Sequence, residues 1–401
     1  MAAVQRQAGV VEGCGVALRG HNSLELLFAY LAALECGARV APLNPRLPAE
    51  LLAHRLPPLD LAFGWSSEPA AWPSGMVPLE VDVARLLSSD PSAAEAQPHR
   101  PSLPPADTPW DPQRLATLTL TSGSSGMPKA AHRYAAHLCS AAGVVTLLDF
   151  QRAGCWLLSL PLYHVSGQGI VWRWLYAGAR LAVQDGVLLA QVLAGCSHAS
   201  LVPTQLWRLL DGSPTSLTLS DVLLGGAMIP AELTTRAEAQ GIRCWCGYGL
   251  TEFASTVCAR RAGVGLPLAG RSLRLVQGEI WLRGASQAAG YWHQGTLLPL
   301  DEGAGWFHTR DRGTLANCAS PAGWTICFFA AAKACSPRIS NACSPAMTAC
   351  ARRLLRRWLT RNTARGRWRI PTSRLRRCAP GSSRNCHRGS VPSLGITYRR
   401  R

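Results

Sequence analysis

Short apolar runs alternate with a helical pattern near the start of the chain. Residues 15–19 (GVALR) and 38–42 (ARVAP) are apolar runs of strand length, and residues 24–36 repeat apolar side chains at helical spacing. Asn22 or Ser23 stands just before the helical stretch, and either side chain is suited to cap a helix. A strand, a helix and a second strand in this order predict a parallel sheet that is covered by helices.

The same alternation returns after a polar connection. Residues 87–113 are rich in proline, serine and alanine, which predicts a surface connection. Further apolar runs of strand length then alternate with helical stretches, so the α/β pattern continues. These runs are residues 115–118, 156–160, 199–202 and 221–224. Residues 272–283 instead hold two alternating runs around Gln277 and Gly278, which predict an antiparallel hairpin and a small β subdomain.

Charge is unevenly distributed along the chain. The 401 residues carry a formal charge of +18, yet residues 1–315 hold 23 basic and 23 acidic residues, whereas residues 316–401 hold 18 basic residues and no acidic one. Seven of the 15 cysteines also fall in residues 316–401. Since 48% of the residues are hydrophobic, the chain can bury a sizeable core, which excludes disorder throughout. The first part is neutral, so any nucleic-acid-binding footprint is confined to the tail.

The apolar segments of the chain indicate no membrane span. No basic leader followed by an apolar segment opens the sequence, and no charge-free apolar stretch is long enough to cross a bilayer. The cysteines of residues 1–315 are scattered, often within apolar runs, as is typical of small buried residues in a reducing compartment. We therefore expect a cytoplasmic protein.

A run of hydroxyl and glycine residues follows the strand predicted at 115–118. Its glycines allow backbone amides to close around phosphate oxygens, its hydroxyls can donate to them, and Lys129 adds a positive charge. A solvent-exposed Ser/Gly linker is the alternative, but the strand before the run and the Pro-Lys pair at its end favour a phosphate loop. The run lacks the Gly-Lys-Ser/Thr ending of a Walker loop. The candidate phosphate ligands are Thr121, Ser122, Gly123, Ser124, Ser125, Gly126 and Lys129.

This run resembles the phosphate loop of the adenylate-forming superfamily of acyl-CoA synthetases and luciferases. Residues 247–252 (GYGLTE) resemble the same superfamily's Tyr-Gly-x-Thr-Glu motif. The resemblance implies that Tyr248 and Gly249 contact adenine, that Thr251 reaches a phosphate, and that Glu252 offers Mg²⁺ the hard oxygen it prefers. The superfamily also cradles adenine after a strand, at a place that corresponds here to a stretch otherwise typical of a tight turn. That stretch is Gly225, Gly226 and Ala227.

Two further segments match the superfamily. Residues 305–313 (GWFHTRDRG) resemble a segment whose aspartate binds both ribose hydroxyls, which gives that role to Asp311. Arg310 stands where the superfamily has glycine. Residues 158–168 place His164 where the superfamily lines its acyl pocket, although a lone histidine near apolar residues is more often structural. The resemblance implies an adenylate-forming N-terminal domain with parallel sheets, helices and a small β subdomain.

The segments between these motifs indicate which carboxylic acid the enzyme would use as its substrate. Residues 166–180, 197–210 and 253–258 resemble the 2-succinylbenzoate:CoA ligase family of menaquinone biosynthesis. Its substrate has an aromatic ring and two carboxylates, so its site needs apolar walls and hydrogen-bond donors. The alternative is an acid:CoA ligase for another aromatic or aliphatic acid. The candidate substrate ligands are His164, Ser166, Thr204 and Gln205.

The resemblance implies a reaction in two steps. The acid carboxylate attacks the α-phosphorus of MgATP and releases pyrophosphate, and CoA then attacks the acyl-adenylate and expels AMP. The expected cofactors are ATP and Mg²⁺, with CoA as co-substrate, and the expected partners are these small molecules without a specific nucleic acid. The sequence does not decide whether the chain forms a homo-oligomer. The implied catalytic residues are Lys129, His164, Thr251 and Glu252.

The tail departs from the superfamily. Residues 316–401 contain one lysine, Lys333, and neither the hinge motif of the type Gly-Arg-x-Asp nor the lysine that serves adenylation. When the codons of residues 322–342 are rebuilt one base earlier, with the free bases allowed to vary, they are compatible with Gly-Arg-Leu-Asp-Asn-Leu-Phe-Phe, then one Cys or Arg, then Gly-Gly-Glu-Gly, one Leu, Val or Met, and Gln-Pro-Glu-Asp-Ile-Glu-Arg. We therefore expect a domain over residues 1–315 with a shortened N-terminus, then a frameshifted basic tail over 316–401 in place of the native C-terminal domain. A disordered tail and a nucleic-acid-binding arm are the alternatives.

Overall fold

The computed structural model describes residues 1–81, 108–120, 129–183, 189–212, 217–261, 263, 265–300, 305–317, 324–329 and 395–397. For residues 129, 315–317, 324–329 and 395–397 the description covers the backbone alone. All of these residues belong to one compact unit, which consists of residues 1–331 and 392–401. Most of the connection predicted at 87–113 lies outside the described residues.

The βαβ unit predicted near the start of the chain is confirmed. Strand β1 (Gly15–Arg19) pairs in parallel with β2 (Arg39–Leu43), and helix α2 (Leu24–Glu35) connects them. Of the two candidate caps, Ser23 takes the role, because its Oγ accepts a hydrogen bond of 3.2 Å from the amide of Leu26.

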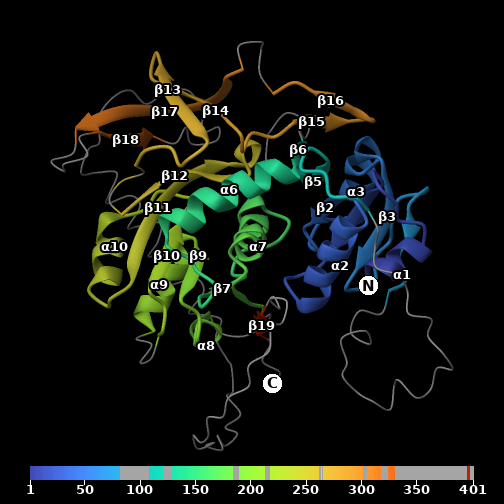
Figure 1. Ribbon diagram of the computed structural model, residues 1–401, viewed down its shortest axis with the longest axis horizontal. Helices are drawn as coiled ribbons and strands as arrows, with labels where there is room; N and C mark the ends of the chain where they lie inside the picture. Colours follow the sequence, from blue (N-terminus) through green and yellow to red (C-terminus); the bar gives the residue numbers. More distant parts are fainter. Residues whose placement is uncertain are drawn as a thin grey trace, which may run out of the picture. The chain divides into compact units, whose positions relative to one another are not determined.

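The βαβ unit belongs to a sheet of eight strands in the order β16-β15-β6-β5-β2-β1-β3-β4. Strands β5, β2, β1, β3 and β4 run parallel to one another, whereas β6, β15 and β16 continue the sheet in antiparallel pairs. The added strands are β3 (Leu61–Ser66), β4 (Val77–Pro78), β5 (Leu115–Leu120), β6 (Lys129–Arg133), β15 (Gly290–His293) and β16 (Thr296–Leu298). Residues far apart in the sequence thereby meet in one sheet (Figure 1).

A second sheet has seven strands in the order β12-β11-β10-β9-β7-β8-β19. Its strands are parallel except for β12, as expected from the α/β pattern. The strands are β7 (Cys155–Leu157), β8 (Arg180–Ala182), β9 (His198–Leu201), β10 (Asp221–Leu224), β11 (Arg243–Leu250), β12 (Ser255–Arg260) and β19 (Gly395–Thr397). The helices that follow them in sequence are α8 (Leu189–Val192), α9 (Pro203–Asp211) and α10 (Ala231–Glu238).

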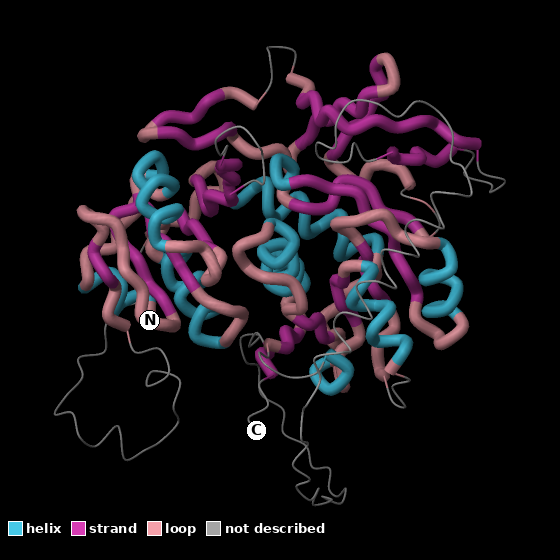
Figure 2. Tube along the Cα trace, turned by 180° about the vertical axis from the view of Figure 1, so that it is seen from behind, coloured by secondary structure: helices cyan, strands magenta, loops and turns pink. Residues whose placement is uncertain are grey.

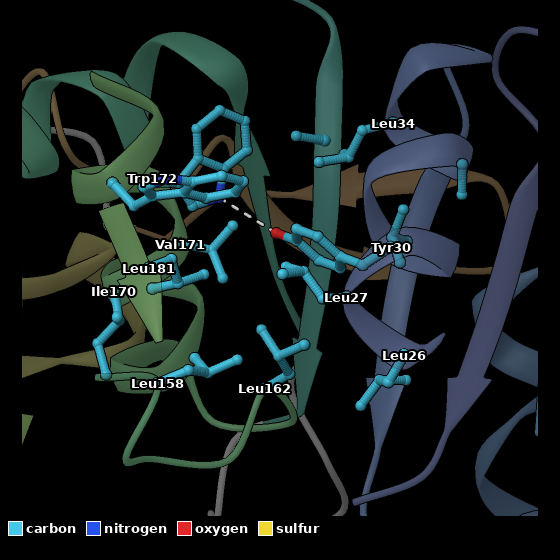
Figure 3. Packing of buried hydrophobic residues seen from close by; sticks show 14 of the residues in the cluster. Leu26, Leu27, Tyr30, Leu34, Leu158, Leu162, Ile170, Val171, Trp172 and Leu181 are labelled. Carbon is cyan, nitrogen blue, oxygen red and sulfur yellow. Dashed lines mark hydrogen bonds between the residues drawn. The ribbon is translucent and has the colours of Figure 1, made fainter. Parts of the chain in front are cut away.

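Helices α6 (Tyr134–Leu147) and α7 (Val165–Ala177) pack against each other and contact strands of both large sheets. Both run between the two sheets when the molecule is viewed from the front and from behind (Figures 1 and 2). The largest buried apolar cluster joins α2 to α7 (Figure 3), where the indole Nε1 of Trp172 donates to the hydroxyl of Tyr30 at 3.1 Å. Burial of this apolar area is the main force that holds α7 in place. The other helices among the described residues are α1 (Ala2–Gln7), α3 (Ala49–Arg55), η1 (Pro57–Leu59) and η2 (Thr251–Phe253).

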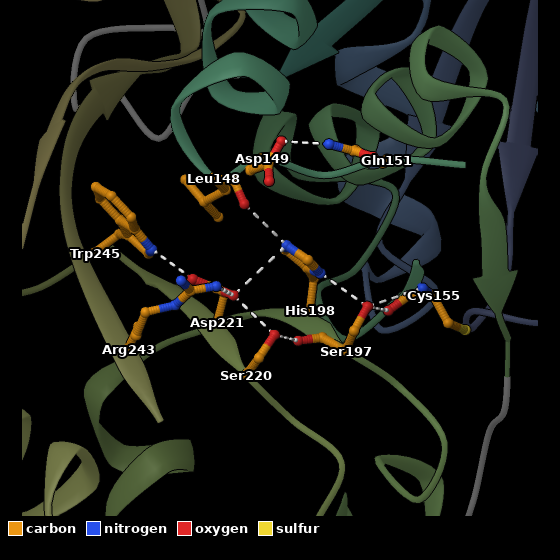
Figure 4. A network of polar contacts seen from close by, with 10 residues as sticks. All are labelled: Leu148, Asp149, Gln151, Cys155, Ser197, His198, Ser220, Asp221, Arg243 and Trp245. Atoms are coloured by element: carbon orange, nitrogen blue, oxygen red, sulfur yellow. Dashed lines mark hydrogen bonds and ion pairs between the residues drawn. The ribbon is translucent and has the colours of Figure 1, made fainter. Parts of the chain in front are cut away.

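A buried polar network joins the first residues of three neighbouring strands in the second sheet (Figure 4). The carboxylate of Asp221 on β10 accepts hydrogen bonds from Arg243 at 2.6 Å, Ser220 at 2.8 Å and Trp245 at 2.9 Å. The Nε2 atom of His198 on β9 lies 3.8 Å from the same carboxylate. These contacts fix the amino ends of the strands, at the edge opposite to the loops that follow their carboxyl ends.

The hairpin predicted around Gln277 and Gly278 is present and starts a small antiparallel sheet in the order β13-β14-β17-β18. Gln277 (φ 51°) and Gly278 (φ 78°) both adopt left-handed conformations, as a two-residue hairpin turn requires. The strands are β13 (Arg271–Val276), β14 (Glu279–Gly284), β17 (Phe307–Asn317) and β18 (Trp324–Phe329). The domain boundary predicted at residue 315 therefore falls within β17.

None of the helices in the described part of the chain is long and apolar enough to cross a membrane.

Candidate active site

The predicted phosphate loop connects two paired strands. Strand β5 ends at Leu120, which lies opposite Lys129, the first residue of β6. Residues 121–128 are outside the described residues, so the candidate ligands Thr121, Ser122, Gly123, Ser124, Ser125 and Gly126 are not placed. For Lys129 the backbone alone is described. The strands thus fix both ends of the loop at the edge where β5 finishes.

Two residues that are predicted to bind the nucleotide come from different sheets and contact each other. The hydroxyl of Tyr248 on β11 donates to Oδ2 of Asp311 on β17 at 2.7 Å. Burial raises the pKa of Tyr248, and the negative charge of Asp311 adds to this effect, so the phenol remains a donor. The amide of Asp311 donates to the Thr309 hydroxyl at 3.0 Å, which orients the aspartate further. A carboxylate held in this way can still accept hydrogen bonds from ribose hydroxyls.

Arg310 occupies a backbone conformation that explains the glycine of the superfamily. Its φ of 61° lies in the left-handed region, which costs a non-glycine residue roughly 1–2 kcal/mol. The amide of Arg310 donates to Oε1 of Glu279 at 2.9 Å. The substitution is therefore accommodated without loss of the bend that precedes Asp311.

The predicted catalytic pair Thr251 and Glu252 lies in the short helix η2, directly after β11. Oε1 of Glu252 accepts a hydrogen bond of 3.0 Å from the hydroxyl of Tyr291. Burial, followed by the charge of Glu252, raises the pKa of Tyr291. No group of three or more possible metal ligands occurs among the described residues. Mg²⁺ in nucleotide sites commonly takes one or two carboxylates together with phosphate oxygens and water, so a single partly buried glutamate fits such an ion.

The predicted adenine cradle directly follows β10. Gly226 has φ 79°, which turns the chain away from the strand. A Cβ atom added to Gly225 would lie 3.6 Å from the carbonyl oxygen of Gly247 on the neighbouring strand. The following residues Ala227 and Met228 are exposed, Met228 to 85%. An exposed apolar surface thus stands beside the segment that carries Tyr248 and Gly249.

The four candidate substrate ligands lie at the starts of two helices. His164 is the residue before α7 and Ser166 lies in its first turn, while Thr204 and Gln205 lie in the first turn of α9. Desolvation lowers the pKa of His164 although part of the ring is exposed. The Oε1 atom of Gln205 accepts a hydrogen bond of 2.9 Å from the amide of Val202, which caps α9. Thr204 is exposed.

Arg173 is a residue that the sequence reasoning missed. It lies on α7 and is 1% exposed, and its guanidinium donates to the hydroxyls of Ser200 and Thr256 at 3.2 Å each. Its Nε atom has no hydrogen-bond partner, and in the described part of the chain no carboxylate forms an ion pair with it. Burial lowers its pKa to about 9, with a contribution from the charge of Arg271. A buried cation of this kind is costly unless an anion compensates it.

Arg173 adjoins the strands that carry the nucleotide motif. Its partner Thr256 on β12 lies opposite Gly249 of β11. A Cβ atom added to Gly169 would lie 3.2 Å from Nη2 of Arg173 and 3.4 Å from Ser255, so this glycine leaves space beside the guanidinium. One sequence signal was available, because Arg173 is the single charged residue in the apolar run 170–177 (IVWRWLYA).

Comparisons with known proteins identify a family for this chain. Residues 1–292 match the family model described as AMP-binding enzyme. The chain is 55% identical over 312 residues to the 2-succinylbenzoate–CoA ligase of Salmonella typhimurium, a match that covers 77% of this chain and 64% of the relative. It is also 55% identical over 314 residues to the enzyme of the same name from Escherichia coli K12, covering 77% of this chain and 65% of the relative.

A solved structure matches as well. Wild-type Escherichia coli MenE with a bound m-phenylether-linked analogue of OSB-AMS is 49% identical, with a TM-score of 0.71 over 82% of this chain and 69% of that chain. The chain spans about two thirds of the curated relatives it matches, 64% and 65% of their lengths. A family model that covers most of the chain, together with the fold and the grouped motifs, shows that the chain belongs to the AMP-binding enzyme family.

Proposed function

We propose that this chain carries the nucleotide-binding and acid-binding part of an ATP-dependent 2-succinylbenzoate:CoA ligase of menaquinone biosynthesis. The relatives support this proposal, since two that are 55% identical bear that name. The products are AMP, pyrophosphate and the acyl-CoA thioester. ATP, Mg²⁺ and CoA are part of the same proposal.

The observation that carries the choice of acid is the buried Arg173. A monocarboxylic acid needs no second cation, because its one carboxylate is consumed at the α-phosphorus. 2-Succinylbenzoate retains a second carboxylate, which a buried guanidinium can bind through two parallel hydrogen bonds. The hydroxyls of Ser200 and Thr256, which now accept from Arg173, orient the guanidinium for this role.

The nucleotide lies across the ends of three strands in this proposal. Asp311 accepts the ribose hydroxyls, Tyr248 contacts the adenine ring, and the turn at Gly225, Gly226 and Ala227 forms the other side of the adenine site. The phosphate loop and Lys129 hold the phosphates. The acid carboxylate is thereby held in line with the α-phosphorus, and positioning and charge neutralisation supply the rate acceleration.

Thr251 and Glu252 act at the phosphates. The Thr251 hydroxyl donates to a phosphate oxygen, and the Glu252 carboxylate holds Mg²⁺ with the Tyr291 hydroxyl as its neighbour. When bound, the ion neutralises charge that develops on the phosphate oxygens. His164 and Ser166 at the start of α7, with Thr204 and Gln205 on α9, border the acid.

We also propose that residues from about 316 onward are translated in a shifted frame. The absence of acidic residues from 316–401 and the single lysine there support it, as does the match of the alternative frame to a hinge motif. A chain without that hinge and without the adenylation lysine binds its ligands but turns over poorly.

A panel of acids tests the choice of substrate. Calorimetric titrations into the full chain with saturating AMP compare 2-succinylbenzoate with octanoate and with two analogues that each lack one carboxylate, 2-butanoylbenzoate and 4-oxo-4-phenylbutanoate. Because both carboxylates are bound, we expect each analogue to bind about 30-fold more weakly or worse than the diacid. A preference for octanoate, or equal affinity for the diacid and both analogues, contradicts the proposal.

A further inference from the structure

His132 links the strand after the phosphate loop to the turn that carries Thr251 and Glu252. It lies on β6, three residues after Lys129, and its ring is fully buried. Its Nε2 atom lies 2.8 Å from the carbonyl oxygen of Thr251. Burial lowers the pKa of His132 to about 4, so the neutral ring has one N–H group. A carbonyl oxygen can only accept, so this proton is on Nε2.

The turn is held at three carbonyl groups. In addition to His132 at Thr251, the amide of Ala288 donates to the carbonyl of Glu252 at 2.8 Å, and the hydroxyl of Ser140 on α6 donates to the carbonyl of Ala254 at 2.6 Å. These donors come from outside the seven-stranded sheet that bears the turn. The main chain of the turn is thus fixed by β6, by α6 and by the segment that precedes β15.

The turn has a conformation that needs such support. Ala254 (φ 51°) and Ser255 (φ 94°) both adopt positive φ values, which are unfavourable for residues with a Cβ atom. Without external hydrogen bonds, the chain after Glu252 would relax toward common backbone conformations. Such relaxation would move the Glu252 carboxylate away from Tyr291.

We propose that His132 is a positioning residue, which holds Thr251 and Glu252 in register with β6, the strand that follows the phosphate loop in sequence, by anchoring the Thr251 carbonyl. The inference rests on the proposed function for its consequence, nucleotide binding, but the anchoring itself is a property of the ligand-free chain. One measurement therefore tests the anchoring in the ligand-free chain, and a second tests its effect on nucleotide binding.

The first measurement is hydrogen exchange of the peptide that covers residues 250–256 in the ligand-free full chain. His132→Leu removes the donor, and we expect exchange of this peptide to become about tenfold faster. His132→Gln places an amide N–H near the position of Nε2 and is expected to restore slow exchange. The matched control is His198→Leu, because His198 is also buried and its Nε2 lies 3.2 Å from the Leu148 carbonyl at the opposite edge of the sheet.

The second measurement is the affinity for MgATP and for AMP. His132→Leu is expected to weaken MgATP binding by about tenfold and AMP binding by less than about twofold, since AMP lacks the β- and γ-phosphates and the Mg²⁺ that Glu252 is proposed to hold. His132→Gln restores the MgATP affinity. The control His198→Leu is expected to lower the unfolding midpoint without changing the ratio of the two affinities.

Unchanged exchange at 250–256 in His132→Leu overturns the proposal, as does an equal effect of His198→Leu on that peptide. If His132→Leu does not fold, His132→Asn replaces it, because asparagine places its donor near Nδ1 and not near Nε2. Equal exchange and equal MgATP affinity in the glutamine and asparagine variants then contradict anchoring through Nε2. A wild-type chain that binds no MgATP counts against the proposed function, and the exchange result still decides the anchoring.

Discussion

At the residue scale, the candidate nucleotide site depends on a hydrogen bond between Tyr248 and Asp311. Tyr248 and Asp311 were each placed by local sequence, but their hydrogen bond joins residues 63 positions apart on two different sheets. Arg310 was noticed as a departure from glycine, and its φ of 61° supplies the reason that glycine is usual there. Arg173 was missed because its meaning depends on burial and on the lack of an acidic partner in the described chain, neither of which a sequence displays.

A substitution of Arg173 tests its role directly. Arg173→Gln removes the charge while it keeps hydrogen-bond donors, so we expect affinity for 2-succinylbenzoate to fall about 30-fold, with AMP affinity unchanged. Calorimetric titrations with the diacid, with its two monocarboxylate analogues and with AMP measure these affinities. The variant should no longer distinguish the diacid from the analogue that lacks the carboxylate bound by Arg173.

The matched control is Arg271→Gln, because Arg271 is also a buried arginine, and its guanidinium binds Ser286, Ala269 and Cys139. We expect it to lower stability and to retain the discrimination among acids. Retained discrimination in Arg173→Gln would instead assign the second carboxylate to another group.

At the element scale, local sequence patterns predicted the strands and helices, but they could not predict which distant strands pair with each other. The βαβ unit at β1, α2 and β2 and the hairpin of β13 and β14 were predictable because each arises from neighbouring residues. The antiparallel addition of β15 to β6 was not, since it joins Ala131 to Gly290. The polar network at the amino ends of β9, β10 and β11 was not predictable either, because it too joins residues that are distant in the sequence.

That network predicts a pH-dependent contribution to stability. Burial by itself would raise the pKa of Asp221, but hydrogen bonds from Arg243, Trp245 and Ser220 outweigh it and lower the pKa below 3.8. A lowered pKa in the folded state means that the stabilisation is complete above the unfolded value and is lost as the pH falls through the folded value. The carboxylate thus stabilises the sheet at neutral pH.

Asp221→Asn removes this charge, so we expect the free energy of unfolding at pH 7 to fall by about 2 kcal/mol. Urea unfolding at several pH values measures it. The difference between wild type and variant should shrink as the pH falls from about 4 toward the lowered pKa of Asp221, because the unfolded chain takes up the proton first and the folded carboxylate takes it up only at lower pH. A difference that stays constant down to pH 3 would mean that the charge of Asp221 does not stabilise the sheet.

At the scale of the whole chain, family membership accounts for the fold of the described residues, whereas the role of residues 316–401 rests on the proposed shifted frame. The phosphate loop that first indicated the family lies outside the described residues, while the strands at both of its ends, β5 and β6, pair with each other. The segment that would complete adenylation was not found in residues 316–401, where Lys333 is the only lysine. Ligand binding and turnover are therefore expected to be separable in this chain.

The most direct test is formation of 2-succinylbenzoyl-CoA from 2-succinylbenzoate, MgATP and CoA. It compares the chain as written with a frame-restored chain, in which residues from 322 onward are translated one base earlier, in the frame that encodes the hinge motif. We predict that the chain as written binds AMP and the diacid but forms little thioester, and that the frame-restored chain forms it readily. Full turnover by the chain as written, or none by the frame-restored chain, would contradict the account.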